Sequence, residues 1–274
     1  MQFVKLNLAR NCLKYIIKAY GIKEIFIPFY SCSILWEAVK EEGCFIKFYH
    51  IDKNFMPLTM FDSNAFILYI NYFGLCSGNC KILEKQYKNL IVDNTHSFYS
   101  EPMGIASFNS LRKFFRVPNG AYLYTKNLID ARLETDDLNI SPILFHEDMD
   151  EFVKNELLLN EQKEIKELSS QVDLLIHKID FEKDKQNRVK LYKEYSKYFY
   201  KDNKIELKLN EGDIPYCYPF CPKDSNSIDI HDLIILRLWN PIPESFVEYS
   251  FLNNTMALPL NDVSYAEKII RILG

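Results

Sequence analysis

The first half of the chain alternates short apolar runs with stretches whose apolar residues recur at helical spacing. The apolar runs have the length of buried strands, and they occupy residues 24–28, 45–49, 65–70 and 90–93. The helical stretches occupy residues 8–20, 31–42 and 79–88. Gly21 and Gly43 follow the first two stretches, where glycine commonly ends a helix. Strands that alternate with helices predict an α/β fold, with a mostly parallel sheet and helices on both faces.

The second half changes character after a further predicted strand at residues 121–124. A polar linker at residues 136–142 precedes two stretches that we predict to be helical, residues 145–178 and 184–200. A coiled coil is the alternative for the first stretch, but its heptads are not sustained. The last predicted elements are short strands at residues 205–209 and 216–221, a helical segment at 231–237 and a final helix at 265–273.

Composition and charge narrow the class of protein. The chain has 274 residues, of which 48% are hydrophobic, so it can bury a large core. Its net charge is −4 and it has no basic tract, which argues against binding to nucleic acid or to a membrane surface. It has no run of about 18 apolar residues, and polar residues interrupt its first helical stretch, unlike a signal peptide. We therefore predict a cytoplasmic protein.

The seven cysteines of a cytoplasmic chain are expected to be reduced thiols. Three residues separate Cys76 from Cys80, and three separate Cys217 from Cys221, which could suggest zinc. However, the tight two-residue spacing of a zinc knuckle and suitably placed histidines are missing. We predict no metal site.

The candidate chemistry lies between residues 90 and 125. An apolar run ends at Asp93, and His96 follows three residues later. Because open α/β sheets bind ligands at the carboxyl ends of their strands, Asp93 is predicted to face a ligand. Lys113 follows in a loop rich in hydroxyl groups, beside Arg112, whose charge favours a neutral lysine amine. A lysine, an acid and phosphate donors are the groups that pyridoxal phosphate (PLP) needs.

Each of these residues has an ordinary alternative explanation. Asp93 could cap the turn after its strand, and Lys113 could be a surface lysine. Their occurrence together, at this spacing, favours the interpretation as a cofactor site.

Three segments carry a more specific signal. They are Asn71-Tyr72-Phe73-Gly74, Val92-Asp93-Asn94-Thr95-His96 and Ser110-Leu111-Arg112-Lys113-Phe114-Phe115-Arg116-Val117-Pro118-Asn119-Gly120. Together they resemble the DegT/DnrJ/EryC1/StrS family of PLP-dependent sugar aminotransferases, in particular a divergent short branch. The resemblance implies fold type I, with a mostly parallel sheet in a large domain and a small C-terminal α+β domain. We expect the large PLP-binding domain at residues 1–135, linking helices at 136–200 and the small domain at 201–274.

The resemblance also implies roles for matching residues. Lys113 would carry the cofactor, Asp93 would face its pyridinium nitrogen, and His96 would lie near its phenolic oxygen. The helix beginning at Ala9 and Arg10 would offer its N-terminus to the cofactor phosphate, since free amides and the helix dipole favour an anion there. The other expected cofactor contacts are Tyr30, Cys32, Asn71, and either Ser107 or Ser110, with Asn109 as a further phosphate donor.

Several of these secondary contacts keep structural alternatives. Arg10 could be an exposed residue of the first helical turn, and Asn71 could belong to a strand-end turn. Tyr30 could be a core aromatic, or Phe29 could take its place beside the cofactor ring. Asn187-Arg188 resembles an element at the domain junction of the family, although a solvated charged helix face is the favoured alternative.

The activity that the resemblance implies is transfer of an amino group, with glutamate as the donor, to a keto group on a nucleotide-linked sugar for surface polysaccharide synthesis. The resemblance also implies a homodimer. The alternative is a catalytically silent relative that binds a nucleotide sugar or a protein partner, which the departures from the family pattern at Ala9 and Cys32 favour. A PLP enzyme of racemisation or elimination is a third alternative.

Overall fold

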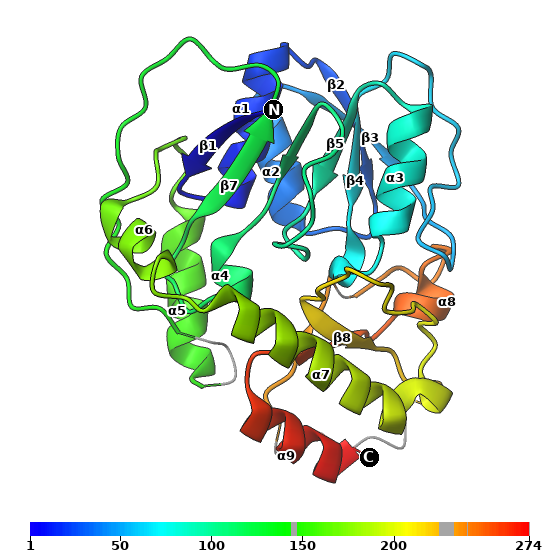
Figure 1. The fold of residues 1–274 in the computed structure, drawn as a ribbon. Coiled ribbons are helices and arrows are strands. Elements are labelled where there is room, and N and C mark those ends of the chain that lie inside the picture. Colours follow the sequence, from blue (N-terminus) through cyan, green and yellow to red (C-terminus); the bar gives the residue numbers. More distant parts are fainter. Residues whose placement is uncertain (144–146, 225–232, 240, 274) are drawn as a thin grey trace.

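The computed structural model describes residues 1–143, 147–224, 233–239 and 241–273. Figure 1 shows a large sheet with helices around it and, at one end of that sheet, a smaller part containing α7, β8 and α9. The two parts lie against each other, and the candidate site is built where they meet.

Seven strands of the described residues form the large sheet. They are β1 (Gln2–Leu6), β2 (Glu24–Pro28), β3 (Phe45–Tyr49), β4 (Ile67–Ile70), β5 (Leu90–Asp93), β6 (Ala106–Phe108) and β7 (Ala121–Thr125). Their order is β1-β7-β6-β5-β4-β2-β3. Pairing is parallel from β3 across to β6, whereas β7 pairs antiparallel with both β6 and β1. The predicted α/β class with a mostly parallel sheet is confirmed.

The helices of this half are α1 (Ala9–Tyr20), α2 (Ser33–Glu41), α3 (Ser77–Gln86) and the single turn α4 (Leu111–Phe114), with a 3-10 turn at Tyr72–Gly74. The steps from β2 to β3 and from β4 to β5 run in opposite directions across the sheet. Right-handed crossovers therefore place α2 and α3 on opposite faces (Figure 1). Every residue of β4 and β5 is buried, which explains their unbroken apolar sequence.

The rest of the chain adds helices and a small antiparallel sheet. The helices are α5 (Met149–Asn160), α6 (Ser170–Ile176), α7 (Phe181–Phe199), α8 (Tyr249–Leu252) and α9 (Val263–Leu273), with a 3-10 turn at Tyr200–Asp202. Strands β8 (Cys217–Phe220), β9 (Leu236–Arg237) and β10 (Met256–Pro259) pair in the order β8-β10-β9 within the described residues. β8 and α9 confirm the strand and the helix predicted at these places.

The single helical stretch predicted at residues 145–178 is wrong. Its first two residues lie in the segment 144–146, outside the described part of the chain, and a non-helical segment separates α5 from α6. In that segment the carbonyl of Lys166 accepts a 3.0 Å hydrogen bond from the backbone amide of Asn7, at the end of β1. Pairing with so distant a segment leaves no trace in local periodicity. Ser169 then caps the new helix α6.

Two smaller predictions are also wrong. Residues 205–209 do not form a strand; instead the carbonyl of Leu207 accepts a 3.2 Å hydrogen bond from the Tyr192 hydroxyl on α7. The helical segment predicted at residues 231–237 begins with two residues outside the described part, and its remainder is not helical but ends in β9. The physical reason is the antiparallel pairing of β9 with β10, which the apolar pattern alone does not distinguish from a helix.

Every helix of the described residues is too short or too polar to cross a membrane. The same residues hold no group of three or more His, Cys, Asp or Glu placed to bind a metal ion. All seven cysteines occupy described positions and have free thiols.

Arg188 on α7 joins the two parts of the molecule. Its side chain is only 1% exposed, so the favoured prediction of a solvated charged face is wrong at this position. The Nε atom pairs with Asp184 at 2.8 Å, Nη1 donates to the carbonyl of Tyr216 at 3.2 Å, and Nη2 donates to the carbonyl of Phe114 at 2.7 Å. The guanidinium carbon also lies 4.4 Å from the Phe114 ring centre. Arg188 thus fixes α4 and the segment before β8 relative to α7.

We expect the substitution Arg188→Met to lower the free energy of unfolding by about 3–5 kcal/mol, because it leaves two buried carbonyls without their donor and Asp184 without its cationic partner. Urea denaturation measures this change. The matched control is Lys190→Met on the exposed side of the same helix, which should change stability by about 0.5 kcal/mol or less. Equal effects of the two substitutions would contradict the anchoring role of Arg188.

Candidate active site

One cavity at the carboxyl edge of the large sheet collects most of the predicted site residues. Its lining includes Ala9, Arg10, Cys32, Asp93, His96, Ser110 and Lys113. These residues come from α1, the start of α2, the end of β5 and α4, which lie far apart in sequence. Their convergence follows from the parallel sheet, because β2 and β5 end at the same edge and α1 begins there.

Asp93 is the last residue of β5 and is only 2% exposed. Its Oδ1 atom accepts a 2.8 Å hydrogen bond from the backbone amide of Thr95. Burial raises the pKa of Asp93 to about 6, although the Thr95 hydrogen bonds and the charge of Lys113 act in the opposite direction. The carboxyl group therefore has an unusually high affinity for a proton and lies within electrostatic reach of Lys113.

Lys113 is the third residue of α4. Burial lowers its pKa, and the neighbouring charge of Arg112 lowers it further, while Cys32, Asp93 and Cys217 act in the opposite direction. Its Nζ atom lies 5.4 Å from the centre of the Tyr216 ring. A lysine amine in this environment is easier to deprotonate, and hence more nucleophilic, than one on the surface.

The His96 imidazole lies in a stack of aromatic rings. Its centroid is 4.7 Å from that of Tyr216 and 5.3 Å from that of Trp239, with interplanar angles of 14° and 5°. Burial, with the Lys113 charge second, lowers the pKa of His96 well below its usual range, so the ring is neutral. Its buried Nδ1 atom has no hydrogen-bond partner among the described residues. Such an atom beside a cavity suits a polar group of a ligand.

Positive charge gathers at the other end of the cavity. Helix α1 begins at Ala9 without a side-chain cap, and its first amides have no carbonyl one turn earlier to bond. Arg10 lies on this first turn, where burial lowers its pKa, and Ser110 is the residue before α4. Two further cationic side chains, Arg112 and Lys113, line the same cavity. This end can accept an anion such as a phosphate.

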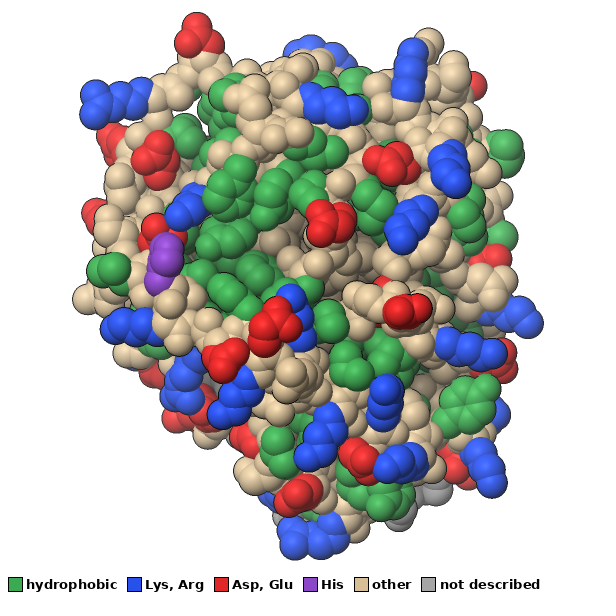
Figure 2. All heavy atoms as spheres, in the orientation of Figure 1, with side chains coloured by type: hydrophobic (Ala, Val, Ile, Leu, Met, Phe, Trp, Pro, Cys, Tyr) green, Lys and Arg blue, Asp and Glu red, His purple; other side chains and the backbone are tan. Residues whose placement is uncertain are grey.

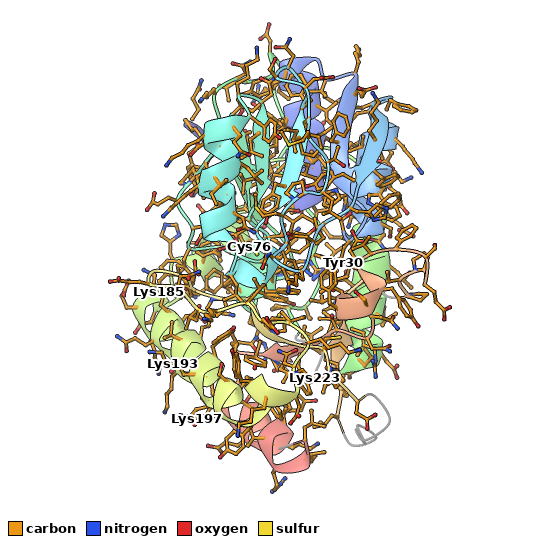
Figure 3. The ribbon with its side chains drawn as sticks, turned by 90° about the vertical axis from the view of Figure 1, so that its right-hand side faces the viewer. Tyr30, Cys76, Lys185, Lys193, Lys197 and Lys223 are labelled. Carbon is orange, nitrogen blue, oxygen red and sulfur yellow. The ribbon has the colours of Figure 1, made fainter. Side chains whose placement is uncertain are left out.

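Four predicted contacts do not line this cavity, and one of them is Asn109, whose Oδ1 accepts a 3.1 Å hydrogen bond from the backbone amide of Tyr122. Tyr30 is buried where the sheet meets the smaller part (Figure 3), with its ring edge-on to Trp239 at 4.8 Å. The Asn71 side-chain amide donates a 3.1 Å hydrogen bond to Asn94 Oδ1. Asn71 Oδ1 accepts a hydrogen bond from the backbone amide of Cys76. Ser107 lies inside β6, and its buried Oγ atom has no partner in the described part of the chain. The geometry favours Ser110 over Ser107 as a phosphate donor.

Sequence reasoning missed several residues of the cavity wall. Trp239 follows β9, and nothing in the sequence indicated that it would reach the ligand edge. Glu156 lies on α5, in a stretch of Glu, Lys and Leu without any motif. Thr95 lies inside the quoted motif and could have been assigned from its place two residues after Asp93. Trp239 and Glu156 could be assigned to the cavity only from the folded structure.

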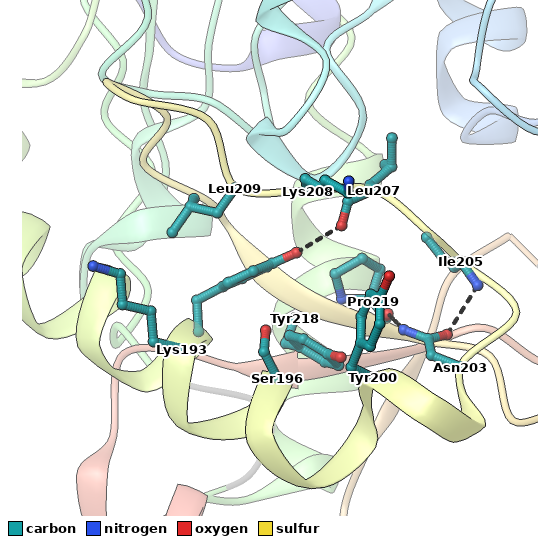
Figure 4. Close-up of a pocket in the computed structure, with 11 residues that line it drawn as sticks. Lys193, Ser196, Tyr200, Asn203, Ile205, Leu207, Lys208, Leu209, Tyr218 and Pro219 are labelled. Atoms are coloured by element: carbon teal, nitrogen blue, oxygen red, sulfur yellow. Dashed lines mark hydrogen bonds between the residues drawn. The ribbon is translucent and has the colours of Figure 1, made fainter.

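Two further cavities differ in their relation to this site. One adjoins it and shares Arg112, Lys113 and Glu156 as lining residues. The other lies away from Asp93, between α7 and the segment after it, and includes Lys193, Ser196 and Tyr200 (Figure 4). Figure 3 shows that Lys193 belongs to a row of lysines along α7. This groove lacks the pairing of an acid with a buried lysine that marks the candidate active site.

No protein-family profile matches this chain, and no curated protein matches its sequence. Solved structures match its fold. A DegT/DnrJ/EryC1/StrS aminotransferase from Brucella abortus is 12% identical, with a TM-score of 0.63, over 99% of this chain and 85% of its own. PseC from Helicobacter pylori, an aminotransferase involved in the biosynthesis of pseudoaminic acid, is 16% identical over the same shares, with a TM-score of 0.59.

NtdA from Bacillus subtilis, solved with bound cofactor PMP, is 10% identical, with a TM-score of 0.62, over 99% of this chain and 72% of its own. At such identities the likeness shows the fold. The resemblance to DegT/DnrJ/EryC1/StrS aminotransferases, and the fold type I architecture that it implied, are confirmed at that level.

The raised pKa of Asp93 gives a stability test on protein without added cofactor. The folded-state value of about 6 exceeds the unfolded value of about 3.8, so the folded protein binds more protons between these pH values. Stability should therefore fall as pH rises from about 4 to about 6. Asp93→Asn removes this penalty, and at pH 7 we expect it to raise the free energy of unfolding by up to about 3 kcal/mol.

Urea denaturation of both proteins at a series of pH values measures the difference, which should vanish near pH 4. The control is Asp62→Asn, at an exposed position, which should give no such pH-dependent gain. A difference that stays constant with pH would mean that the Asp93 carboxyl is not desolvated.

Proposed function

We propose that this protein binds PLP in the cavity at the carboxyl edge of the sheet and is an aminotransferase. The observation that carries the proposal is that the buried Asp93 and the half-buried Lys113 line one cavity, with pKa values shifted toward a proton-binding acid and a neutral amine. The unpartnered Nδ1 of His96 and the cationic end of the cavity fit the polar groups of PLP. When bound, PLP supplies an electron sink for exchange of an amino group.

The residues take distinct roles in this proposal. Lys113 Nζ would hold the cofactor and, once free of it, would serve as general base and acid for proton transfer. Asp93, ionised above its pKa of about 6, would keep a proton on the pyridine nitrogen by pairing with the pyridinium charge. His96, neutral and stacked on Tyr216 and Trp239, would offer Nδ1 to the phenolic oxygen.

The anionic end of the cofactor would bind at the start of α1. The amides of Ala9 and Arg10, the hydroxyl group of Ser110 and the Arg10 guanidinium together supply donors and positive charge. Cys32 would lie beside the ring. Tyr30, Asn71 and Ser107 would support this shell from behind, since other residues line the cavity.

For the substrates we propose glutamate as amino donor and a keto sugar, linked to a nucleotide, as acceptor, in surface polysaccharide synthesis. The aminotransferase from Helicobacter pylori, involved in the biosynthesis of pseudoaminic acid, supports a sugar-related acceptor. We also propose a division into a PLP-binding domain at residues 1–135, linking helices at 136–200 and a small domain at 201–274. Trp239 would then be the contribution of the small domain to the site.

A homodimer completes the proposal. Hydrophobic side chains gather over β7 and α4 on the face shown in Figure 2. At the adjacent sheet edge, Phe3 on β1 is 48% exposed and packs on the rings of Tyr122 and Tyr124 at 5.0 and 5.1 Å. A second copy of the chain would cover these aromatic rings.

The cofactor is tested by adding PLP to the purified protein. We expect a visible absorbance band that disappears on borohydride reduction, with the reduced label on Lys113 by peptide mass spectrometry. Lys113→Ala should abolish the label, because no other amine occupies that position, whereas the control Lys126→Ala, at an exposed lysine, should retain it. Colourless wild-type protein that takes up no PLP would favour the silent alternative.

The dimer is tested by light scattering after size exclusion. We expect a mass of twice the 32.4 kDa of one chain, and we expect Phe3→Lys to shift the protein toward the monomer because a charge at the interface is costly to bury. The matched control is Phe45→Lys, since Phe45 is 63% exposed on β3 at the opposite edge of the sheet. A monomeric wild-type protein would refute the homodimer.

A further inference from the structure

We propose that Arg112 is the binding group for a carboxylate of the amino donor, and that Glu156 occupies this position until the donor arrives. The inference rests on the proposed aminotransferase function and adds to it a specific donor-recognition site. Its substrate class is an amino acid that carries a carboxylate within reach of the Lys113 amine.

The first observation is the pairing of Arg112 itself. Its Nη2 atom donates to Oε1 of Glu156 on α5, and its guanidinium carbon lies 6.0 Å from the centre of the Phe152 ring, one turn earlier on that helix. The side chains of Arg112 and Glu156 are 19% and 30% exposed, so the pair is accessible to a small ligand. The arginine thus already holds a carboxylate oxygen, in a place where a substrate carboxylate would serve equally well.

The second observation is the position of this pair between two cavities. The cavity proposed for the cofactor contains Asp93, His96 and Ser110, whereas the adjoining cavity is lined by Tyr216, Cys217 and Asn261. Arg112, Lys113 and Glu156 line both. A donor in the adjoining cavity would therefore meet the Lys113 amine and the Arg112 guanidinium from the side opposite the proposed cofactor contacts.

The charges of the adjoining cavity favour an anion. Among its lining residues, which all belong to the described chain, Glu156 is the one acidic side chain, beside two cationic ones. A carboxylate that replaces Glu156 restores the same charge balance at Arg112. Burial lowers the pKa of Arg112 to about 10, and the nearby charge of Arg10 acts in the same direction, so its charged form gains from a carboxylate partner.

The helix that carries Glu156 is able to release it. α5 exposes Val153 and Leu157, at 47% and 61%, on its outer side. It is tied to the preceding chain by the hydrogen bond from Asn155 Nδ2 to the carbonyl of Ser141, at 2.9 Å. The buried residues of α5 are Asn155 and Leu159, whereas the Glu156 side chain is already 30% exposed, so its rotation toward solvent leaves the buried core unchanged.

A guanidinium group binds phosphate as well as carboxylate, so the cofactor phosphate is the competing ligand for Arg112. We assign the carboxylate because its present partner is one, and because α1 and Ser110 already supply the anionic end of the cofactor cavity. Separate titrations with a dicarboxylate and with inorganic phosphate therefore distinguish the two ligands.

The experiment uses the full chain with and without PLP, and titrates glutarate, a dicarboxylate that has no amino group to react. Binding is followed by tryptophan fluorescence, since Trp239 lines the cofactor cavity, and by calorimetry. Arg112→Lys keeps the charge but loses the planar guanidinium that can donate two parallel hydrogen bonds to one carboxylate. We expect it to weaken glutarate binding by about tenfold or more. Glu156→Gln should tighten it by about two- to fivefold, the contribution of a partly exposed ion pair.

The matched control is Arg116→Lys. Arg116 pairs with Glu147 in the same region, but its side chain is 58% exposed and it lines neither cavity. Its substitution should leave glutarate affinity unchanged within about twofold. The PLP affinity of Arg112→Lys, read from the absorbance band, should fall less than its glutarate affinity, because α1 and Ser110 supply other donors to the anionic end of the cofactor. Arg112→Gln provides a second variant, and thermal unfolding checks that each variant is folded.

Three results would overturn the inference. Unchanged glutarate affinity in Arg112→Lys and Arg112→Gln would remove Arg112 as the carboxylate site. Weaker binding of PLP and of inorganic phosphate, with glutarate binding spared, would assign Arg112 to the cofactor phosphate instead. Unchanged affinity in Glu156→Gln would refute the competition by Glu156. Failure of the proposed function looks different, because wild-type protein would then take up no PLP whatever the outcome of the glutarate titrations.

Discussion

The burial of one carboxyl group and one amine in the same cavity is the constraint on which the site depends. Asp93 and Lys113 both lose water, which disfavours the charged form of each, and their mutual attraction only partly compensates. A fold keeps such a pair only if rigid elements hold it. β5, paired with a strand on either side and buried throughout, holds the acid, and α4 holds the amine.

The amine depends on contacts far from it in sequence. The Arg188 side chain is only 1% exposed, and it donates hydrogen bonds to the backbone carbonyls of Phe114 and Tyr216. Phe114 follows Lys113 in the chain, and the Lys113 amine lies 5.4 Å from the centre of the Tyr216 ring. The Tyr216 ring in turn stacks on His96. One buried guanidinium therefore sets the positions of the amine, the ring beneath it and, through that ring, the imidazole. This explains why a charged residue is retained in the core, where an apolar one would be cheaper to bury.

The alternation of strands and helices, and the placement of Asp93 and Lys113 at one edge, could be predicted because they rest on local patterns and on a rule of parallel sheets. The break in the helical stretch at residues 145–178 could not, because Lys166 pairs with Asn7 across the chain. The burial of Arg188 and the position of Glu156 in the cavity wall could not be predicted either, since both residues lie on helices with ordinary charged sequences. Tyr30, Asn71 and Ser107 were assigned from the resemblance, which does not fix which side chains reach the cavity, and they pack behind its wall.

The ion pair of Arg112 with Glu156 bears on the lysine as well as on the donor. A bare guanidinium next to Lys113 would depress the pKa of the amine strongly, while a paired one acts as a smaller net charge. If a substrate carboxylate replaces that of Glu156, the charge beside the amine stays nearly constant. The combined effect of burial, Arg112 and Asp93 on the proton affinity of Lys113 then need not be readjusted each time a donor enters or leaves. A neutral partner at Arg112 would lack this property, which is a physical reason for an acidic residue at position 156.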